Sequence, residues 1–141
     1  MIELPDTWCV PILRADFTDD DLWARLQQEI TSPTKEGFLA GVDFVDSPEL
    51  MGLSELDVAR AVPRRYPRRY RHPVLFVVDA LTVTGREHPL LVLNLSQRAP
   101  GDPFRTTPRQ VQSIENNLSI SNMDFIEFAQ AVDPDGVFRG F

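Results

Sequence analysis

Residues 73–95 have the sequence PVLFVVDALTVTGREHPLLVLNL, in which two apolar runs are separated by a short polar segment. The first run, Pro73 to Val83, is rich in Val, Leu and Phe without alternation, which predicts a strand buried on both faces. Gly85 to Pro89 is typical of a turn, and Leu90 to Leu95 is a second apolar strand. Because so few residues join the two strands, we expect them to pair as an antiparallel hairpin.

The N-terminal half predicts a strand–helix–strand unit beside this hairpin. Val10 to Ala15 is a short apolar strand, and residues 41–46 (GVDFVD) are a second one. Between them, Asp19 to Thr31 repeats apolar residues at helical spacing, and Thr18 is the expected N-cap. Such a unit joins parallel strands by a right-handed crossover. A further helix is expected over Ser54 to Ala61.

Two more helices are expected in the C-terminal third. Thr107-Pro108 is a cap followed by proline at the first helical position, which predicts a helix start. Ser121 to Asp124 begins the second helix, with Ile120 and Phe125 as an expected hydrophobic staple. Residues 133–141 (DPDGVFRGF) predict a turn followed by a short strand or tail.

Together these elements predict one domain over residues 1–141, of the mixed α/β (α+β) class. Their order is β-α-β-α-β-β-α-α with an optional last strand, which favours a mixed sheet of four or five strands with helices packed on it. This order resembles the thioredoxin-like topology, and His72-Pro73 lies where that fold has a proline before its third strand. The redox cysteine pair of that fold is missing from the sequence, so the resemblance concerns topology and implies no activity.

The composition restricts the classes of function. Of the 141 residues, 21 are acidic and 14 are basic, so a formal charge of −7 disfavours nucleic acid binding outside one basic loop. The lone Cys9 rules out an internal disulfide and Cys-rich zinc motifs, and a reducing cytoplasm is the expected compartment. The first residues do not have the pattern of a signal peptide, and the longest apolar run is too short for a bilayer. We therefore expect a cytoplasmic protein with no membrane contact.

A distinctive motif occupies the C-terminal third. Residues 113–129 (SIENNLSISNMDFIEFA) and 135–141 (DGVFRGF) resemble the ending of a family of small actinobacterial proteins of unknown function. Residues 13–20 (LRADFTDD) and 75–80 (LFVVDA) are similar to the family's N-terminal and central segments, so the likeness covers nearly the whole chain. The resemblance implies a bacterial cytoplasmic protein, and it brings no activity, cofactor or site residue with it.

The sharpest local departure from the acidic average is the loop of residues 64–71 (RRYPRRYR). Guanidinium groups match phosphate and carboxylate geometry, and tyrosine rings stack on bases or apolar surfaces. The loop predicts a contact with an acidic protein partner, a phosphate-bearing ligand or RNA. The alternative is a solvated loop whose arginines pair with the chain's own carboxylates. The candidate binding residues are Arg64, Arg65, Tyr66, Arg68, Arg69, Tyr70 and Arg71.

Three aspartates near expected strand ends form an alternative site. Asp16 follows the first strand, Asp46 ends the second, and Asp79 interrupts the apolar run of residues 73–83. Because ligands bind at the carboxyl ends of parallel strands, these carboxylates could hold Mg²⁺ in a small metal-dependent enzyme. The alternative gives them turn and cap positions, and no Gly-rich phosphate loop accompanies them. We therefore expect no metal and no cofactor.

The remaining candidates are weaker. His72 and His88 begin the two hairpin strands, roughly 30 Å apart, so they cannot share a metal. The amides of residues 116–122 could bind a ligand, although capping is their ordinary role. Cys9 is expected to be a buried, inert thiol.

From the sequence we therefore expect a binding module that engages a protein partner, with no catalytic residue. An immunity-type or pathway accessory protein with an acidic binding face is an alternative.

Overall fold

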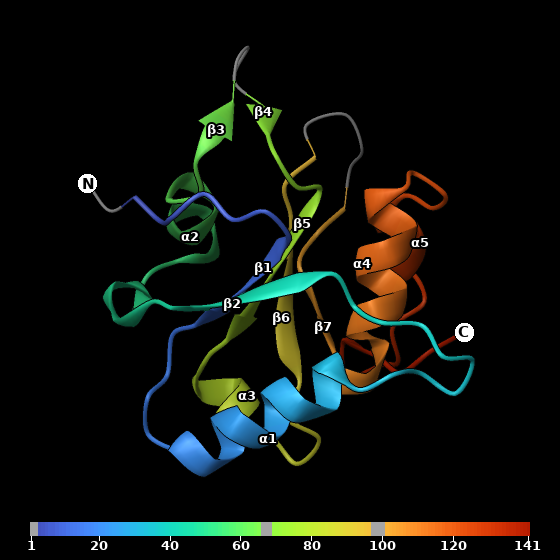
Figure 1. Cartoon of the computed structure of the whole chain (residues 1–141), viewed down its shortest axis with the longest axis horizontal. Coiled ribbons are helices and arrows are strands. Elements are labelled where there is room, and N and C mark those ends of the chain that lie inside the picture. The colour runs from blue at the N-terminus through green and yellow to red at the C-terminus, as the bar shows by residue number, and fades with distance from the viewer. Residues whose placement is uncertain (1–2, 66–68, 97–100) are drawn as a thin grey trace.

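The centre of the fold is a mixed sheet whose strands follow the order β2-β1-β5-β6-β7-β8 (Figure 1). The computed structural model describes residues 3–65, 69–96 and 101–141, with the backbone alone at residues 64–65 and 69–70. The mixed α/β class is confirmed, and the described sheet has six strands where the sequence predicts four or five. The strands are β1 (Val10–Arg14), β2 (Val42–Asp46), β5 (Val74–Val78), β6 (Leu90–Asn94), β7 (Phe104–Thr106) and β8 (Val137–Phe138).

Helices cover both faces of this sheet (Figure 1). One face carries α1 (Asp20–Thr31), α3 (Ala80–Thr84), α4 (Val111–Ser119) and α5 (Phe125–Ala129), with the 3₁₀ turn η2 (Pro108–Gln110) leading into α4. The other face carries α2 (Glu55–Arg60) and the 3₁₀ turn η1 (Pro48–Leu50). The sheet therefore lies between two layers and has a hydrophobic core on each side.

The strand pairing confirms the two units expected from the sequence. β1 runs parallel to β2 over its whole length, with Val10 opposite Val42 and Arg14 opposite Asp46. On its other side β1 runs parallel to β5, and β5 pairs antiparallel with β6 as a hairpin. β2 is consequently an edge strand, and no strand of the described residues lies along its outer side.

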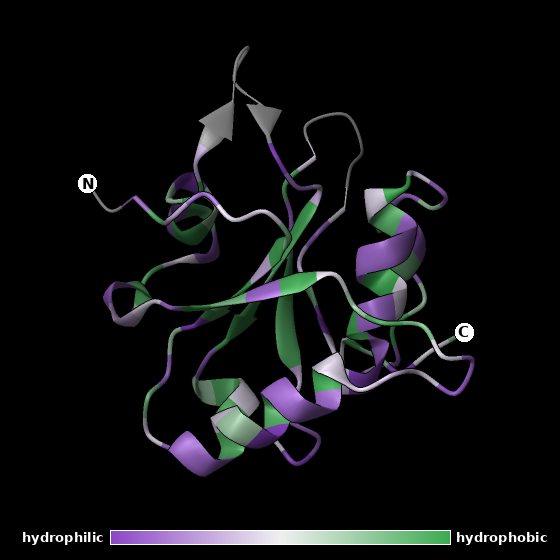
Figure 2. Ribbon diagram, in the orientation of Figure 1, coloured by the Kyte–Doolittle hydropathy of each residue, from purple (hydrophilic) through white to green (hydrophobic). Residues whose placement is uncertain are grey.

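Alternate residues of β5 belong to the two opposite cores. Val74, Phe76 and Val78 pack with α1 and α4, whereas Leu75 and Val77 pack with α2. All five are at most 3 % exposed, which explains why this run has no polar alternation. Figure 2 shows the apolar strands in the centre and polar residues along the outward sides of α1 and α4.

The strand expected over Pro73 to Val83 is too long, because the chain leaves the sheet after Val78. Asp79 caps α3 instead: its Oδ1 accepts the backbone N–H of Thr82 at 3.2 Å, and Thr82 Oγ1 accepts the N–H of Asp79 at 3.2 Å. This reciprocal cap satisfies backbone amides that a continued strand would have paired. A local capping pair therefore overrides the apolar pattern of residues 80–83.

Two expected helix starts also differ in detail. The N-cap of α1 is Asp19, whose Oδ1 accepts the N–H of Leu22 at 2.9 Å, whereas Thr18 donates to Asp16. Ile120 is exposed while Phe125 is buried in the core, so the expected staple does not form, and a capping box between Asp124 and Glu127 begins α5. In both places a carboxylate takes the position assigned to another residue, since it accepts backbone N–H groups more strongly.

Short strands account for the remaining differences. β7 lies in a stretch that the sequence leaves unassigned, and residues 63–72, expected as a loop, contain a small antiparallel hairpin. The hairpin consists of β3 (Arg64–Arg65) and β4 (Arg69–Tyr70) and projects from the body of the molecule (Figure 1). In the part of the chain that the structure describes, every helix is too short or too polar to cross a membrane.

Candidate functional site

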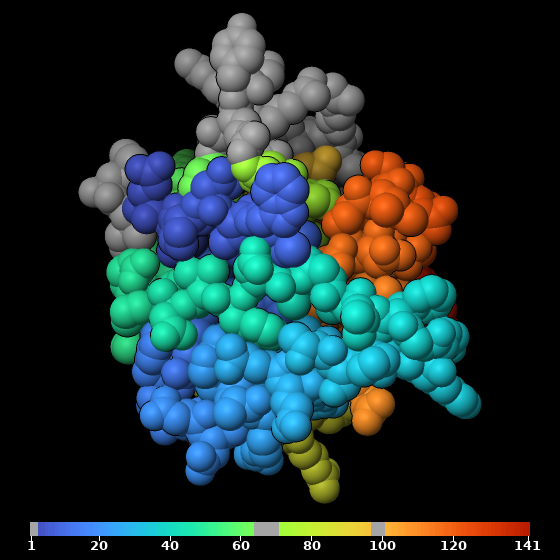
Figure 3. All heavy atoms as spheres, viewed as in Figure 1, coloured from blue at the N-terminus to red at the C-terminus, as the bar shows by residue number. Residues whose placement is uncertain are grey.

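A wide hollow, here called the polar groove, lies where the segment after α1 crosses α4. Its volume is about 970 Å³, and its walls are the end of α1, residues 32–38, η2, α4 and the tail at residues 139–141. In Figure 3 the segment after α1 (cyan) lies against the surface of α4 (orange). Three separate stretches of the chain therefore meet at this groove, residues 25–38, 108–117 and 139–141.

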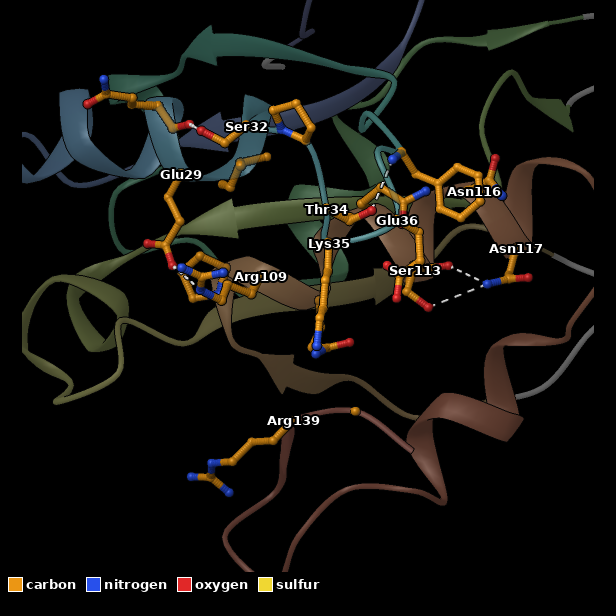
Figure 4. A pocket seen from close by; sticks show the side chains of 18 of the residues that line it. Glu29, Ser32, Thr34, Lys35, Glu36, Arg109, Ser113, Asn116, Asn117 and Arg139 are labelled. Atoms are coloured by element: carbon orange, nitrogen blue, oxygen red, sulfur yellow. Dashed lines mark hydrogen bonds and ion pairs between the residues drawn. The ribbon is translucent and has the colours of Figure 1, made fainter.

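A self-contained turn forms one wall of the groove. The N–H of Thr34 donates to the carbonyl of Phe38 at 2.8 Å, and the N–H of Phe38 donates to Thr34 Oγ1 at 3.0 Å. Gly37 has φ +88°, a backbone conformation that favours glycine and closes the turn. Lys35 extends from this turn between Arg109 and Ser113 (Figure 4).

A buried carboxylate fastens the same segment to α4. Glu115 is 7 % exposed, and its Oε1 accepts the backbone N–H of Gly41 at 2.5 Å. Gly41 lies three residues after Phe38, where the turn closes, so this hydrogen bond ties the segment that carries the turn to α4.

Amide side chains line the groove on three sides. Asn117 is used structurally, since its Nδ2 donates to the carbonyl of Ser113 at 2.8 Å and its Oδ1 accepts from Asn122 at 2.8 Å. This bonding supports the capping interpretation of residues 116–122. By contrast, four lining amides have no side-chain hydrogen bond within the described residues: Gln28, Gln110, Gln112 and Asn116.

The tail is held in place by a network around Arg139. Its guanidinium donates to Glu87, Asp133 and Asp135 at 2.6 to 3.1 Å. These hydrogen bonds lower the pKa of Glu87 and of Asp135 and raise that of Arg139. Phe141 then packs on the rings of two buried phenylalanines, yet its own ring remains 78 % exposed beside the groove.

The charges of the groove differ from the acidic average of the chain. Four basic and two acidic residues line it. Arg139 is neutralised by its network, and Arg109 lies 3.6 Å from Glu29. Arg25 and Lys35 make no ion pair with any residue that the structure describes. Among the described residues, the groove therefore offers two cations and one carboxylate, that of Glu36, without an ion pair, together with polar neutral groups.

A second hollow, here called the strand-end cleft, lies beside the carboxyl ends of β1 and β5 on the α2 face. Its volume is about 360 Å³, and its floor includes Val58, Val77 and Leu91, all buried. Met51 and Leu81 stand exposed at its rim. Asp16, Glu55, Asp79 and Arg105 supply its charged groups.

Asp79 and Arg105 form a two-pronged ion pair in this cleft. Arg105 Nη1 donates to Asp79 Oδ1 at 2.9 Å, and Nη2 donates to Oδ2 at 2.8 Å. Burial alone would raise the pKa of Asp79, but the hydrogen bonds and charge of Arg105, with help from Thr82, hold that pKa below its usual value. Arg105 comes from β7, a strand that the sequence pattern does not predict, so the sequence gives no reason to place Arg105 at this site.

The three aspartates expected at one site are thus divided. Asp16 and Asp79 both line the strand-end cleft, as the strand-end rule predicts. Asp46 lies at the exposed end of the edge strand β2 and does not line the cleft. Within the described residues, no three His, Cys, Asp or Glu side chains are grouped so that they could hold a metal ion.

One family model covers almost the whole chain. A model for a domain of unknown function, DUF6924, matches residues 9–141. The chain belongs to this family. No curated protein and no solved structure matches the chain, so the thioredoxin-like topology stays a prediction. Every strand of the sheet, the polar groove and the strand-end cleft lie within the DUF6924 match.

The arginine-rich loop of this DUF6924 domain can be followed in part. Arg64–Arg65 and Arg69–Tyr70 form the two strands of the projecting hairpin, and residues 66–68 lie outside the described residues. Arg71 donates from Nε and Nη2 to the two carboxylate oxygens of Asp6, each at 3.1 Å. Its guanidinium carbon also lies 5.5 Å from the ring centroid of Trp8. Arg71 therefore pairs within the chain, and the contact of the rest of the loop with a partner stays a prediction.

The histidines and the cysteine of the DUF6924 domain have local partners. His72 Nε2 lies 2.9 Å from the carbonyl of Thr7, and His88 Nδ1 lies 3.0 Å from the carbonyl of Thr82. The two rings thus contact separate parts of the chain. Cys9 is half-buried, and burial, with the nearby charges of Asp43 and Glu115, raises the pKa of its thiol. The expectation that Cys9 is buried is therefore wrong, but a thiol held protonated is a poor nucleophile, which supports the expected inertness.

Proposed function

We propose that this DUF6924 domain is a non-enzymatic binding module for a protein partner, and that an extended segment of the partner binds in the polar groove. The observation that carries this proposal is the set of lining amides without hydrogen-bond partners among the described residues, Gln28, Gln110, Gln112 and Asn116. Each amide side chain offers both a donor and an acceptor. A peptide backbone presents the same two groups at every residue, so amides can pair with it irrespective of its side chains.

Two aromatic side chains at the groove support a macromolecular partner. Phe38 is 59 % exposed and Phe141 is 78 % exposed, and both line the groove. Large apolar groups gain free energy when a partner removes them from water, and exposed aromatic residues surrounded by polar ones are typical of interaction sites. The volume of about 970 Å³ is sufficient for several residues of an extended chain.

The uncommitted cations suggest the chemistry of the bound segment. Lys35 and Arg25 face the groove, whereas the whole chain carries a charge of −7. A strongly acidic partner would be repelled at long range, so a near-neutral segment with one or two carboxylates fits best. The attraction then acts at short range and contributes mainly to specificity.

A bacterial cytoplasmic setting fits this proposal. A single half-buried cysteine suits a reducing compartment, and thirteen of the 14 basic residues are arginine, a usage that suits a GC-rich bacterial genome. The hairpin of residues 64–71 remains the alternative contact for the same partner.

Selection of peptides from a random display library on the immobilised domain provides the test. A selected peptide should shift the backbone amide NMR signals of residues 33–38 and 110–117. Gln112→Ala combined with Asn116→Ala should weaken its binding about tenfold, since each lost hydrogen bond contributes roughly 1 kcal/mol or less at such a site. Gln130→Ala removes an exposed amide that does not line the groove and should leave the affinity unchanged.

Two results would contradict the proposal. Shifts confined to residues 64–71 would assign the contact to the hairpin instead of the groove. Equal affinities for the groove variant and for the Gln130→Ala control would show that the lining amides do not bind the peptide.

A further inference from the structure

We propose that the strand-end cleft is a second binding site, which takes a small organic cation with an apolar body. The cleft shares no residue with the polar groove, so this proposal does not depend on the proposed function.

The position of the cleft follows from the sheet topology. β1 lies between β2 and β5 and is parallel to both, so the order of the parallel strands reverses at β1. Beyond their carboxyl ends, β1 and β5 lead into α1 and α3 on one face, while residues 50–55 close the cleft from the α2 face. In open α/β sheets, ligands bind outside the carboxyl ends of the strands, and the cleft lies at these ends of β1 and β5.

The interior of the cleft suits an apolar body. Val58, Val77 and Leu91 form a floor that is at most 8 % exposed, and Met51 and Leu81 stand at the rim with 69 % and 59 % of their surface exposed. Covering these side chains would remove apolar surface from water. The volume of about 360 Å³ is at the small end of the range for ligand pockets, which indicates a compact molecule.

The charges select a cation over an anion. Arg105 is the one basic residue among those lining the cleft, and its charge is compensated by Asp79. Asp16 and Glu55 make no ion pair with any other residue that the structure describes. Thr18 donates its N–H and its hydroxyl to Oδ1 of Asp16, and the structure describes no partner for Oδ2. The negative charge of these two lining carboxylates attracts an ammonium group into the cleft, whereas it repels an anion.

Three probes with the same phenyl ring separate the contribution of the apolar body from that of the charge: phenethylamine, 2-phenylethanol and 3-phenylpropionate. In NMR titrations of the whole chain, phenethylamine should shift the amide signals of Gly52, Ala80 and Leu81. It should bind about tenfold more tightly than the neutral alcohol, and the anion should not saturate the site. Raising the salt concentration should weaken the binding of the amine and leave the binding of the alcohol unchanged.

Variants test the assigned carboxylates. Asp16→Asn and Glu55→Gln should each weaken the binding of phenethylamine several-fold and leave the binding of 2-phenylethanol unchanged. Glu55→Gln is the safer variant because Glu55 is exposed, whereas Oδ1 of Asp16 accepts the N–H of Thr18. Asp21→Asn is the matched control, since it removes the same charge from an exposed residue that does not line the cleft.

Three outcomes would overturn the proposal. These are equal affinities for the amine and the alcohol, shifts that map away from the cleft, and an equal loss of affinity in the Asp21→Asn control. Absence of saturable phenethylamine binding at millimolar concentration would overturn it as well.

Discussion

Asp79 has two roles at one position, because it caps α3 and holds Arg105 of β7. Its pKa in the folded chain is lowered, whereas in the unfolded chain it should be near 3.9. The stabilisation is therefore fully present above the unfolded value and is lost as the pH falls through the lower folded value.

Asp79→Asn should lower the free energy of unfolding at pH 7 by about 1–3 kcal/mol, since the ion pair is lost and Arg105 is left partly buried without its carboxylate. The loss should shrink as the pH is lowered below the ordinary pKa of an aspartate, because Asp79 of the unmodified chain then takes up a proton as well. Urea unfolding at several pH values measures this. The control is Asp57→Asn, which breaks an exposed pair with Arg60 at 3.9 Å and should cost less than about 1 kcal/mol. Similar losses in both variants would refute the special role of Asp79.

Glu115 provides a second prediction at the scale of one residue. Glu115→Ala should cost about 1–3 kcal/mol, because it leaves the N–H of Gly41 without its acceptor. Glu115→Gln retains an amide oxygen that can accept the same hydrogen bond, so it should keep most of the stability. Hydrogen exchange at Gly41 should accelerate in the Ala variant. An unchanged exchange rate there would mean that Glu115 does not fasten the groove wall.

Some site residues were predictable individually and others were not. The strand-end rule correctly brought Asp16 and Asp79 to one cleft, because both follow parallel strands of the same sheet. Asp46 is the last residue of a parallel strand too, but that strand, β2, lies at the edge of the sheet, away from the cleft. The position of a strand in the sheet depends on the strand order, which the local sequence pattern does not encode. Arg105 lies among residues 101–107 (GDPFRTT), where a single apolar side chain gives no strand signal.

At the scale of the elements, the approach to β7 requires a glycine. Gly101 has φ +155°, and a Cβ there would overlap the ring of Phe125, which is buried against Phe104. Gly101→Ala should therefore destabilise the fold by about 1–3 kcal/mol for the clash, in addition to about 1–2 kcal/mol for the backbone.

Gly136→Ala is the control for the backbone cost alone. Gly136 has φ +81°, and a Cβ there would meet no atom within 4 Å, so about 1–2 kcal/mol is expected. Guanidinium unfolding of both variants gives the difference. Equal costs would mean that Phe125 moves aside freely.

The helices and central strands were predicted where local signals agreed with each other. α1 begins and ends within a residue of its expected bounds, because helical spacing, acidic first-turn residues and a following proline coincide. The strand expected over residues 73–83 failed at Asp79, where apolar residues continue but a cap begins a helix. The apolar pattern alone does not distinguish a buried strand from a short buried helix.

For the whole molecule, the sharing of β5 between the two cores predicts a single cooperative unit. Leu75→Ala opens a cavity on the α2 face and should cost about 2–5 kcal/mol. Trp23 is buried in the opposite core, whereas the other tryptophan, Trp8, is exposed, so the change in tryptophan fluorescence on unfolding should report the same shifted midpoint as far-ultraviolet circular dichroism. Separate transitions from the two probes would show that the layers unfold independently and would contradict one domain over residues 1–141.

The polar groove could not be predicted from the sequence, because its walls are brought together only by the packing of the whole molecule. Its walls come from residues 25–38, 108–117 and 139–141, which are distant along the chain and meet because α1 and α4 share one face of the sheet. Of these wall residues, the sequence points only to the amides of residues 116–122, and it favours a capping role for them. Helix placement on a given face depends on tertiary packing, which no local period encodes.

The open edge of β2 has a practical consequence for handling the protein. Unpaired backbone groups along a sheet edge can recruit the edge of another molecule, and a charge on the strand opposes such stacking. Asp46 supplies that charge at the exposed end of β2. Asp46→Val should therefore aggregate more readily than the unmodified chain at the same protein concentration, as measured by light scattering.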